Sequence, residues 1–412
     1  MGAPARLLLL LPTTTYRAAA FVEAARRLDV ELTVGTDHRS VFAGDQPERL
    51  LTLDFARRDR AVAQARAFAA AHPVAAVVGV DDETAILAAA IAAALDLPHN
   101  PVAAALAARD KHLQRTAMAR AGVPVPAFRR HRLGEPAAAA AAAAPYPCVL
   151  KPLCLSASRG VIRADTPEAF VAARAVLAEI LAETHADDYL VEAFVPGPEA
   201  ALEGLLEDGR LQPLALFDKP DPLDGPYFEE TIYVTPSRLP PGVQRELIAC
   251  AGHAASALGL VTGPVHVELR HNSRGPWLIE LGARPIGGRC SAALRFGPGP
   301  GALSLEELLL RRALGLPVPS VEREVAASGV MMIPVPGAGV LRAVRGVEAA
   351  RAVPGIEDVA ITAHPGQRLV PPPRGAQYPG FLFARGESPA EVETALRRAH
   401  ALLRFELATN GE

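Results

Sequence analysis

The segment that decides the fold is residues 266–281, HVELRHNSRGPWLIEL. Two apolar runs flank the polar turn 272–275, a pattern that predicts a β-hairpin. Each run contains one glutamate, Glu268 or Glu280, and a hairpin places the two carboxylates side by side. Paired carboxylate oxygens suit Mg²⁺, which takes its other ligands from water and from phosphate oxygens. The alternative interpretation is a pair of solvent-facing glutamates on an antiparallel sheet.

Length and composition define the broad class of the chain. Its 412 residues are enough for roughly three domains at ~150 residues each. Half of the residues are apolar, 21% are charged and the net charge is -3, so we expect a globular protein with no nucleic-acid or membrane partner. The apolar stretch 84–95 is shorter than the ~20 residues that a membrane-spanning helix needs. The four cysteines form no C-x-x-C pair, which fits a reducing cytoplasm.

Lysine is rare in this chain compared with arginine. Only three of the 42 basic residues are lysines, namely Lys111, Lys151 and Lys219. A lysine retained against this arginine bias is expected where a compact ammonium is needed. Arg284 follows Glu280 by four residues, so we expect its guanidinium within reach of a phosphoryl or acyl oxygen.

A strand that ends in lysine precedes a loop of small residues. The run 148–150 predicts the strand, Lys151 ends it, and the loop 155–160 follows. Small residues let backbone N–H groups approach phosphate oxygens, and lysine adds a point charge. The candidate phosphate contacts in the loop are Ser156, Ser158 and Gly160. An ordinary hairpin turn is the alternative interpretation.

A second strand, residues 189–195, leads into a Pro-Gly-Pro turn. An extended segment of this kind offers backbone N–H and C=O groups to the edge of an adenine base, with Ala193 and Val195 as candidate contacts. Glu192 would face the exocyclic amine, and Glu199, after the turn, would face the ribose hydroxyls. A strand that ends in a surface turn explains the same residues without a ligand.

The wider pattern divides the chain into four units. Strand-like runs alternate with helical patterns in residues 1–100, which predicts a parallel sheet. Residues 101–188 hold one helix that carries Lys111, followed by the lysine strand and its small-residue loop. Residues 189–320 are typical of a larger, mostly antiparallel sheet. Residues 321–412 predict a C-terminal α+β domain.

These features, in this order and spacing, resemble the ATP-grasp superfamily over about residues 100–320. The resemblance implies a multidomain α/β and α+β architecture, with an ATP-grasp fold between an N-terminal Rossmann-like domain and the C-terminal α+β domain. It implies ATP and Mg²⁺ as cofactors, with Lys111 and Lys151 on the phosphates and the small-residue loop as a lid. The metal would be held by Glu268 and Glu280. Lys151 and Arg284 would act in catalysis.

One position departs from the family pattern. The E-x-N-x-R segment of the family has an asparagine where this chain has Gly282. That asparagine is a usual ligand of metal or phosphate. The number of Mg²⁺ ions that the chain binds therefore stays open.

Three further segments resemble the branch of L-amino-acid (dipeptide) ligases and carnosine synthases: residues 218–231, 263–268 and 284–289. This resemblance implies that Glu229 or Glu230 holds a substrate ammonium, and that Arg284 and Arg289 hold a carboxylate or an acyl phosphate. His266 would border the site, because it faces the same way as Glu268 on its strand; a structural histidine is the alternative. The same branch places Gly287 and Gly288 in a substrate loop.

The reaction that the resemblance implies is activation of a carboxylate by the γ-phosphate of ATP, followed by attack of an amine. The partners would be a small-molecule acid and amine, and we expect a monomer or a homodimer in the cytoplasm. One alternative is an ATP-grasp carboxylase or purine-pathway enzyme that uses bicarbonate or formate. Another is a nucleotide-binding regulator without turnover. Loss of Glu268, Glu280 or Lys151 would favour the regulator, and all three residues are present.

Overall fold

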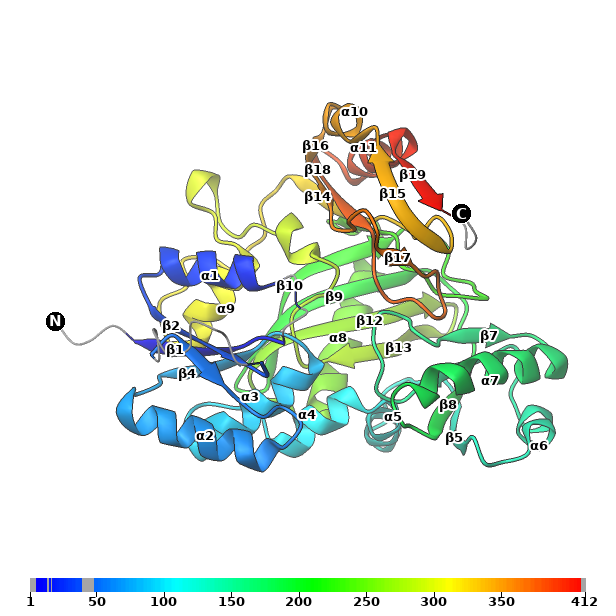
Figure 1. Cartoon of the computed structure of the whole chain (residues 1–412), viewed down its shortest axis with the longest axis horizontal. Coiled ribbons are helices and arrows are strands. Elements are labelled where there is room, and N and C mark those ends of the chain that lie inside the picture. The colour runs from blue at the N-terminus through cyan, green and yellow to red at the C-terminus, as the bar shows by residue number, and fades with distance from the viewer. Residues whose placement is uncertain (1–4, 13–14, 16, 39–47, 409–412) are drawn as a thin grey trace.

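Figure 1 shows the computed structural model of the protein, which describes residues 5–12, 15, 17–38 and 48–408. The N-terminal strands form a four-stranded parallel sheet in the order β3-β2-β1-β4. The elements of this unit are β1 (Arg6–Leu10), α1 (Ala18–Arg27), β2 (Glu31–Thr36), β3 (Leu50–Thr52), α2 (Arg58–Ala71), β4 (Ala76–Gly79) and α3 (Asp82–Ala94).

The leucine run of β1 explains why this sheet is buried on both faces. Leu7 and Leu9 share a core with α1, whereas Leu8 and Leu10 share a core with α2 and α3. A parallel strand that is covered on both faces needs apolar side chains at successive positions. The predicted parallel sheet is confirmed.

Two helices, instead of the single one predicted around Lys111, connect this unit to the next sheet. A single residue, Asp110, separates the helix α4 (Val102–Arg109) from the helix α5 (Lys111–Arg120), and its backbone is extended. The side chain of Asp110 accepts hydrogen bonds from the N–H groups of His112 and Leu113. The prediction of one helix was wrong because this aspartate starts a new helix as its N-cap.

The second sheet has four antiparallel strands in the order β5-β8-β6-β7. Its elements are β5 (Phe128–Arg132), α6 (Ala137–Ala142), β6 (Cys148–Pro152), β7 (Ile162–Ala164), α7 (Pro167–Ala182) and β8 (Asp188–Ala193). The helices α6 and α7 share an apolar core with the sheet. Because β6 is an inner strand, Lys151 near its end is buried.

The central sheet has eight strands in the order β13-β12-β9-β10-β11-β14-β18-β16. Its strands are β9 (Glu199–Glu207), β10 (Arg210–Lys219), β11 (Ile232–Thr235), β12 (Gly263–Asn272), β13 (Gly275–Gly282), β14 (Ala327–Met332), β16 (Ile356–Ile361) and β18 (Gly380–Gly386). Neighbouring strands pair antiparallel. The long helix α8 (Pro241–Leu258) covers one face with an apolar core. Strands from the C-terminal region thus extend the sheet that carries the glutamate hairpin.

The remaining elements lie beside these sheets. They are α9 (Leu305–Ala313), β15 (Gly339–Arg345), α10 (Val347–Arg351), β17 (Arg368–Leu369), α11 (Pro389–Leu402) and β19 (Arg404–Ala408), with short 3-10 helices at Cys290–Ala293 and Gly299–Gly301. The strands β17, β15 and β19 form a small sheet of their own. The predicted mixed α/β and α+β architecture is confirmed.

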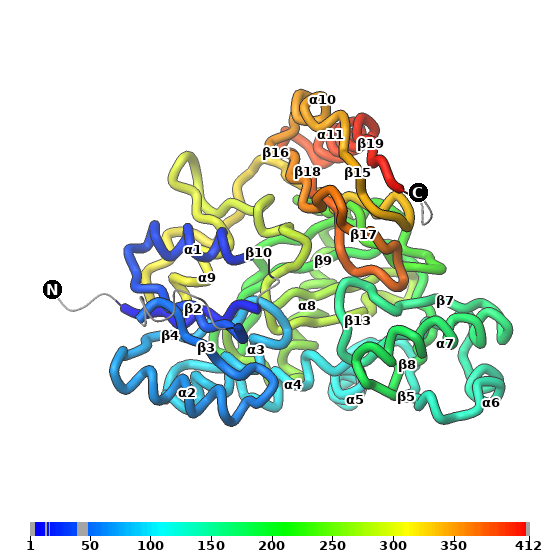
Figure 2. Tube along the Cα trace, in the orientation of Figure 1, coloured from blue at the N-terminus to red at the C-terminus, as the bar shows by residue number. Residues whose placement is uncertain are grey.

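Figures 1 and 2 show how these units surround the central sheet. The N-terminal unit (blue) and the β5–β8 unit (green) lie at opposite ends of the sheet, and the C-terminal elements (orange to red) lie above it. The chain after β17 descends to the β5–β8 unit, where the carbonyl of Pro373 accepts a hydrogen bond from the N–H of Gly160. Within the described ranges, every helix is too short or too polar to cross a lipid bilayer.

Candidate active site

A cavity of about 690 Å³ lies where all four units meet. Asp82 from the N-terminal unit, Lys151 from the second sheet, Glu268 from the central sheet and Tyr378 from the C-terminal region line its walls. Most candidate residues from the sequence also line it: Lys111, Ser156, Ser158, Glu192, Ala193, Val195, Glu199, Glu230, His266, Glu280, Arg284, Gly287 and Gly288. The structure therefore gathers residues that lie far apart in the chain into one chamber.

The predicted hairpin is present as β12 and β13, and Glu268 lies directly opposite Glu280 in its register. Both carboxylates face the cavity, so they are not a solvent-facing pair. Glu280 Oε1 lies 3.0 Å from Lys111 Nζ. Burial opposes ionisation, but Lys111 and Lys151 outweigh it and lower the pKa of Glu280 to about 2. Glu268 differs, because burial raises its pKa despite the nearby Lys219.

Lys219, which the sequence analysis did not place in the site, lies at the centre of a cluster of three predicted site glutamates. Its Nζ lies 2.6 Å from Glu199 Oε1, 2.6 Å from Glu230 Oε1 and 3.4 Å from Glu268 Oε1. The three glutamates bring carboxylate oxygens within 4.8 Å of one another, close enough to hold a metal ion. Burial lowers the pKa of Lys219, but Glu199 and Glu230 outweigh it and raise that pKa well above its usual value. The only available signal was that Lys219 is one of three retained lysines.

Glu199, the predicted ribose contact, is held by cations on both sides. Its Oε2 accepts a hydrogen bond from Arg270 Nε at 2.8 Å, and its Oε1 faces Lys219. Both oxygens are therefore engaged by cations inside the protein, because β10 and β12 flank β9 on either side. Sequence reasoning missed Arg270, since no local pattern distinguishes it from the other arginines.

Glu192 lies between two cations. Its Oε2 lies 2.5 Å from Lys151 Nζ, and its Oε1 accepts a hydrogen bond from Arg115 Nε at 2.6 Å. Burial alone would raise the pKa of Glu192, but Arg115 and Lys151 hold it below its usual value. Glu192 lines the cavity with both carboxylate oxygens paired to cations, and its contact with an adenine amine stays a prediction. Arg115, which is fully buried, was missed because it lies in a helix with other polar residues.

The small-residue loop after β6 forms one wall of the cavity. Ser156, Ala157 and Ser158 line it, and the last two have φ of 54° and 53° in the left-handed region. The carbonyl of Leu155 accepts a hydrogen bond from Lys111 Nζ at 2.8 Å. The linker lysine therefore joins this loop to Glu280 of β13.

The hinge after β8 has fewer free backbone groups than expected. The N–H of Ala193 donates to the carbonyl of Ala127 and that of Phe194 to Pro147. The carbonyl of Val195 accepts from Arg270 Nη1 at 2.7 Å. Ala193 and Val195 still line the cavity, but these particular groups hold the hinge to its neighbours.

Three predicted residues do not line the cavity: Gly160, Glu229 and Arg289. Gly160 has φ of 73° and packs against Pro152, where a Cβ would lie 2.9 Å from Pro152 Cγ. Glu229 Oε1 accepts a hydrogen bond from the N–H of Val335 at 3.0 Å. The guanidinium of Arg289 lies over the ring of Phe383, 5.4 Å from its centroid. Of the two glutamates predicted to hold a substrate ammonium, only Glu230 lines the cavity.

His266 borders the cavity, as predicted, and sits between two carboxylates. Its Nε2 lies 3.4 Å from Glu268 Oε1 and its Nδ1 lies 3.5 Å from Glu203 Oε2. Burial lowers the pKa of His266. The adjacent loop turns at Gly288, which has φ of 57° and packs tightly against Met332.

Three segments of the chain match known protein families. Residues 144–293, which contain β6, the hinge and the glutamate hairpin, match the ATP-grasp domain. The chain contains an ATP-grasp domain. Residues 22–99 match the ATP-grasp N-terminal domain, and residues 331–408 match the L-amino acid ligase C-terminal domain 2. The predicted resemblance to the amino-acid ligase branch is confirmed.

Several individual proteins resemble this ATP-grasp chain. The crystal structure of L-amino acid ligase from Bacillus licheniformis superposes with a TM-score of 0.79 and 26% identity, over 99% of this chain and 100% of that one. Alanine-anticapsin ligase of Bacillus subtilis is 31% identical over 54% of this chain and 51% of its own length. Carnosine synthase 1 of Gallus gallus is 36% identical over 31% of this chain and 13% of its own length. The match thus spans about half of alanine-anticapsin ligase and much less of carnosine synthase 1.

Proposed function

We propose that the protein is an ATP-dependent carboxylate-amine ligase that joins amino-acid-like substrates through an acyl phosphate. The observation that carries this proposal is that one cavity holds both a lysine-carboxylate cluster and Arg284, with a wall from the region that matches the L-amino acid ligase C-terminal domain. That wall includes Met332, Tyr378 and Phe381. A cavity of this size accommodates a nucleotide together with small acids and amines.

The donor set in the cavity fits Mg²⁺. Carboxylate oxygens are the hard ligands that this ion prefers, and Glu268 has a raised pKa, so its ionised form lacks a sufficient counter-charge. Glu268 and Glu280 would hold the ion, with Glu199 and Glu230 close to Glu268. When bound, Mg²⁺ neutralises charge on the phosphate oxygens during phosphoryl transfer.

The reaction has two steps, and different residues of the cavity act in each step. In the first step, a carboxylate oxygen attacks the γ-phosphorus of ATP, the bond to ADP breaks, and an acyl phosphate forms. Lys111 and Lys151 reduce the repulsion between the carboxylate and the triphosphate. In the second step, an amine attacks the acyl carbon, loses a proton and displaces phosphate, and Arg284 stabilises the negative oxygen of the tetrahedral intermediate.

The loop 155–160 would exclude water during these steps, because an acyl phosphate hydrolyses if water reaches it. Its contact with the chain after β17, through Gly160 and Pro373, supports coordinated closure of the loop and the C-terminal region. A ligase of this kind would draw its substrates from the cytoplasm. A monomer or a homodimer remains our expectation for its assembly.

Screening the purified protein with Mg²⁺, ATP and pools of L-amino acids tests the proposal. We expect amino-acid-dependent release of ADP and phosphate, and a dipeptide or other amide detectable by mass spectrometry. Turnover that depends on bicarbonate or formate instead would favour the carboxylase or purine-pathway alternative. The absence of turnover with every pool would favour the nucleotide-binding regulator.

A further inference from the structure

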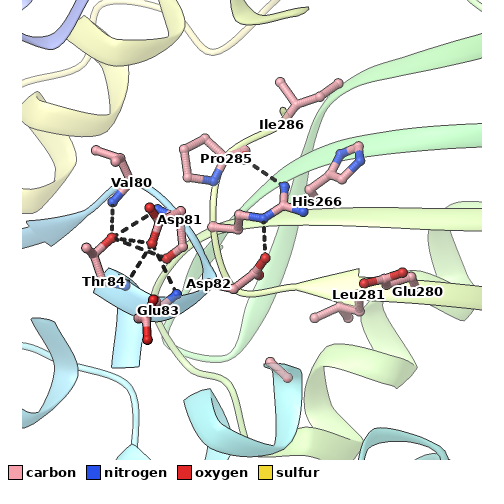
Figure 3. Close-up of polar contacts among 12 residues, drawn as sticks. Val80, Asp81, Asp82, Glu83, Thr84, His266, Glu280, Leu281, Pro285 and Ile286 are labelled. Carbon is pink, nitrogen blue, oxygen red and sulfur yellow. Dashed lines mark hydrogen bonds and ion pairs between the residues drawn. The ribbon is translucent and has the colours of Figure 1, made fainter. Parts of the chain in front are cut away.

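Asp82 of the N-terminal unit contacts Arg284, which lies 202 positions later in the chain. Its Oδ2 accepts a hydrogen bond from Arg284 Nε at 3.0 Å, drawn as the dashed line at Asp82 in Figure 3. Both side chains are largely buried and line the cavity. This is the contact through which the first domain reaches the residue that we place in the second chemical step.

The position of Asp82 is fixed by the turn that starts α3 (Figure 3). Asp81 Oδ1 accepts hydrogen bonds from the N–H groups of Glu83 and Thr84, at 3.1 and 2.8 Å. Thr84 Oγ1 in turn accepts one from the N–H of Asp81 at 3.1 Å. These reciprocal bonds form a capping box, which holds the first turn of the helix in one conformation. Asp82 therefore approaches Arg284 from a rigid support.

Gly282 provides the space for this contact. A Cβ at position 282 would lie 3.2 Å from Asp82 Oδ1 and 3.2 Å from Arg284 Cγ. Its φ is outside the left-handed region, so backbone freedom does not explain the glycine. The absent side chain leaves the room that the aspartate and the arginine use.

The rest of the arginine and its loop are also held. Arg284 Nη1 donates to the carbonyl of Pro285 at 3.1 Å, and no described residue accepts a hydrogen bond from Nη2. Arg17, also from the N-terminal unit, donates to the carbonyls of Pro285 and Ile286. The N–H of Ile286 donates to Glu203 at 3.1 Å. With Nε bound to Asp82 and Nη1 to the carbonyl of Pro285, both N–H groups of Nη2 are left for a ligand.

We propose that Asp82 is a positioning residue, which fixes the guanidinium of Arg284 so that Nη2 meets the acyl oxygen. This inference rests on the proposed ligase function and adds the N-terminal domain to its machinery. Asp82 acts through Arg284 and does not touch the reacting atoms. Gly282 is part of the same device, because a side chain there would separate the two residues.

The first test compares Asp82→Ala, Arg284→Ala, the double variant and Glu83→Ala in the full-length protein. Glu83 is a matched control, since it lies in the same helical turn but pairs with Arg109 at 3.6 Å and does not line the cavity. We expect Asp82→Ala to lower kcat at least tenfold with the KM for ATP unchanged within twofold. The double variant should be no slower than Arg284→Ala, and Glu83→Ala should match the parent. Normal turnover by Asp82→Ala, or losses that multiply in the double variant, would overturn the proposal.

A second test uses Gly282→Ala, which keeps Asp82 and Arg284 in place. The added methyl group should lower kcat at least fivefold in the parent, and less than twofold further when Asp82 is already alanine. If Gly282→Ala lowers kcat equally in the parent and in Asp82→Ala, or in neither, Gly282 does not act through the contact between Asp82 and Arg284. If the parent itself turns over no amino acid, the ligase proposal fails. Crystal structures of the parent and of Asp82→Ala then test separately whether Asp82 positions Arg284. A displaced or multiply oriented Arg284 in the variant supports it, and an unchanged Arg284 overturns it.

Discussion

Lys111 Nζ lies 3.0 Å from Glu280 Oε1, so the first residue of α5 is paired with β13, an edge strand of the central sheet. Its hairpin neighbour Glu268 instead faces Lys219. Two glutamates that are opposite in register thus have different counter-ions. This difference determines how substitutions at each glutamate should behave.

Lys151→Arg should lose most of the activity while the fold remains intact. The ammonium of Lys151 is buried and lies 2.5 Å from Glu192, beside the guanidinium of Arg115. A second planar guanidinium in that position lacks room and presents its charge differently to phosphate. Steady-state kinetics of this variant, with the exposed Arg130→Lys as a control, make the measurement. Turnover near the parental value would contradict the role of Lys151.

Glu268→Gln and Glu280→Gln should each raise the Mg²⁺ concentration needed for half-maximal activity. Each change removes one anionic ligand and keeps the shape of the side chain. We expect kcat to fall by about tenfold or more, which is about 1.4 kcal/mol of transition-state stabilisation. Activity titrated against Mg²⁺ measures both effects. Curves that overlay those of the parent would remove these glutamates from the metal site.

The same two variants should differ in stability without nucleotide. The pKa of Glu280 is lowered to about 2 in the folded protein, so its ion pair stabilises the fold above the ordinary glutamate pKa and is lost as pH falls toward 2. Glu280→Gln should therefore destabilise the protein at pH 7, by an amount that shrinks as the pH falls below about 4.5. Glu268→Gln should be neutral or stabilising, because burial raises the pKa of that carboxyl. Urea unfolding at several pH values would reveal the contrast, and equal losses for the two variants would contradict it.

Lys219→Met should destabilise the protein strongly at pH 7. The substitution leaves Glu199, Glu230 and Glu268 without the ammonium that they share, and loss of one partner of a buried ion pair costs about 3–5 kcal/mol. Burial raises the pKa of Glu230 and of Glu268, so protonating them at lower pH relieves the repulsion, and the deficit should shrink from pH 7 to pH 5. Added Mg²⁺ should stabilise this variant more than the parent. A loss of stability that depends on neither pH nor Mg²⁺ would show that the carboxylates do not form one electrostatic cluster.

Local patterns in the sequence were sufficient for much of the fold. The leucine run of β1, the lysine at the end of β6 and the hairpin that carries Glu268 and Glu280 all follow from residues close together in the chain. Apolar periodicity and turn residues report such elements directly.

Pairings between distant residues could not be predicted in the same way. Arg115 meets Glu192 from 77 positions away, and Arg284 meets Asp82 from 202. These pairings depend on how α5 and α3 pack against the sheets. The spacing of apolar residues within one segment does not predict that packing. The surroundings of Glu192 were missed for the same reason, because its neighbours in the sequence do not reveal that Arg115 and Lys151 enclose it.

The most direct measurement follows oxygen atoms through the reaction. If the cavity activates a carboxylate as an acyl phosphate, an amino acid labelled with ¹⁸O in its carboxyl group transfers one labelled oxygen to the phosphate released with ADP. We expect mass spectrometry to find this labelled phosphate together with the amide product. Unlabelled phosphate, or AMP and pyrophosphate in place of ADP, would contradict acyl-phosphate formation at this site.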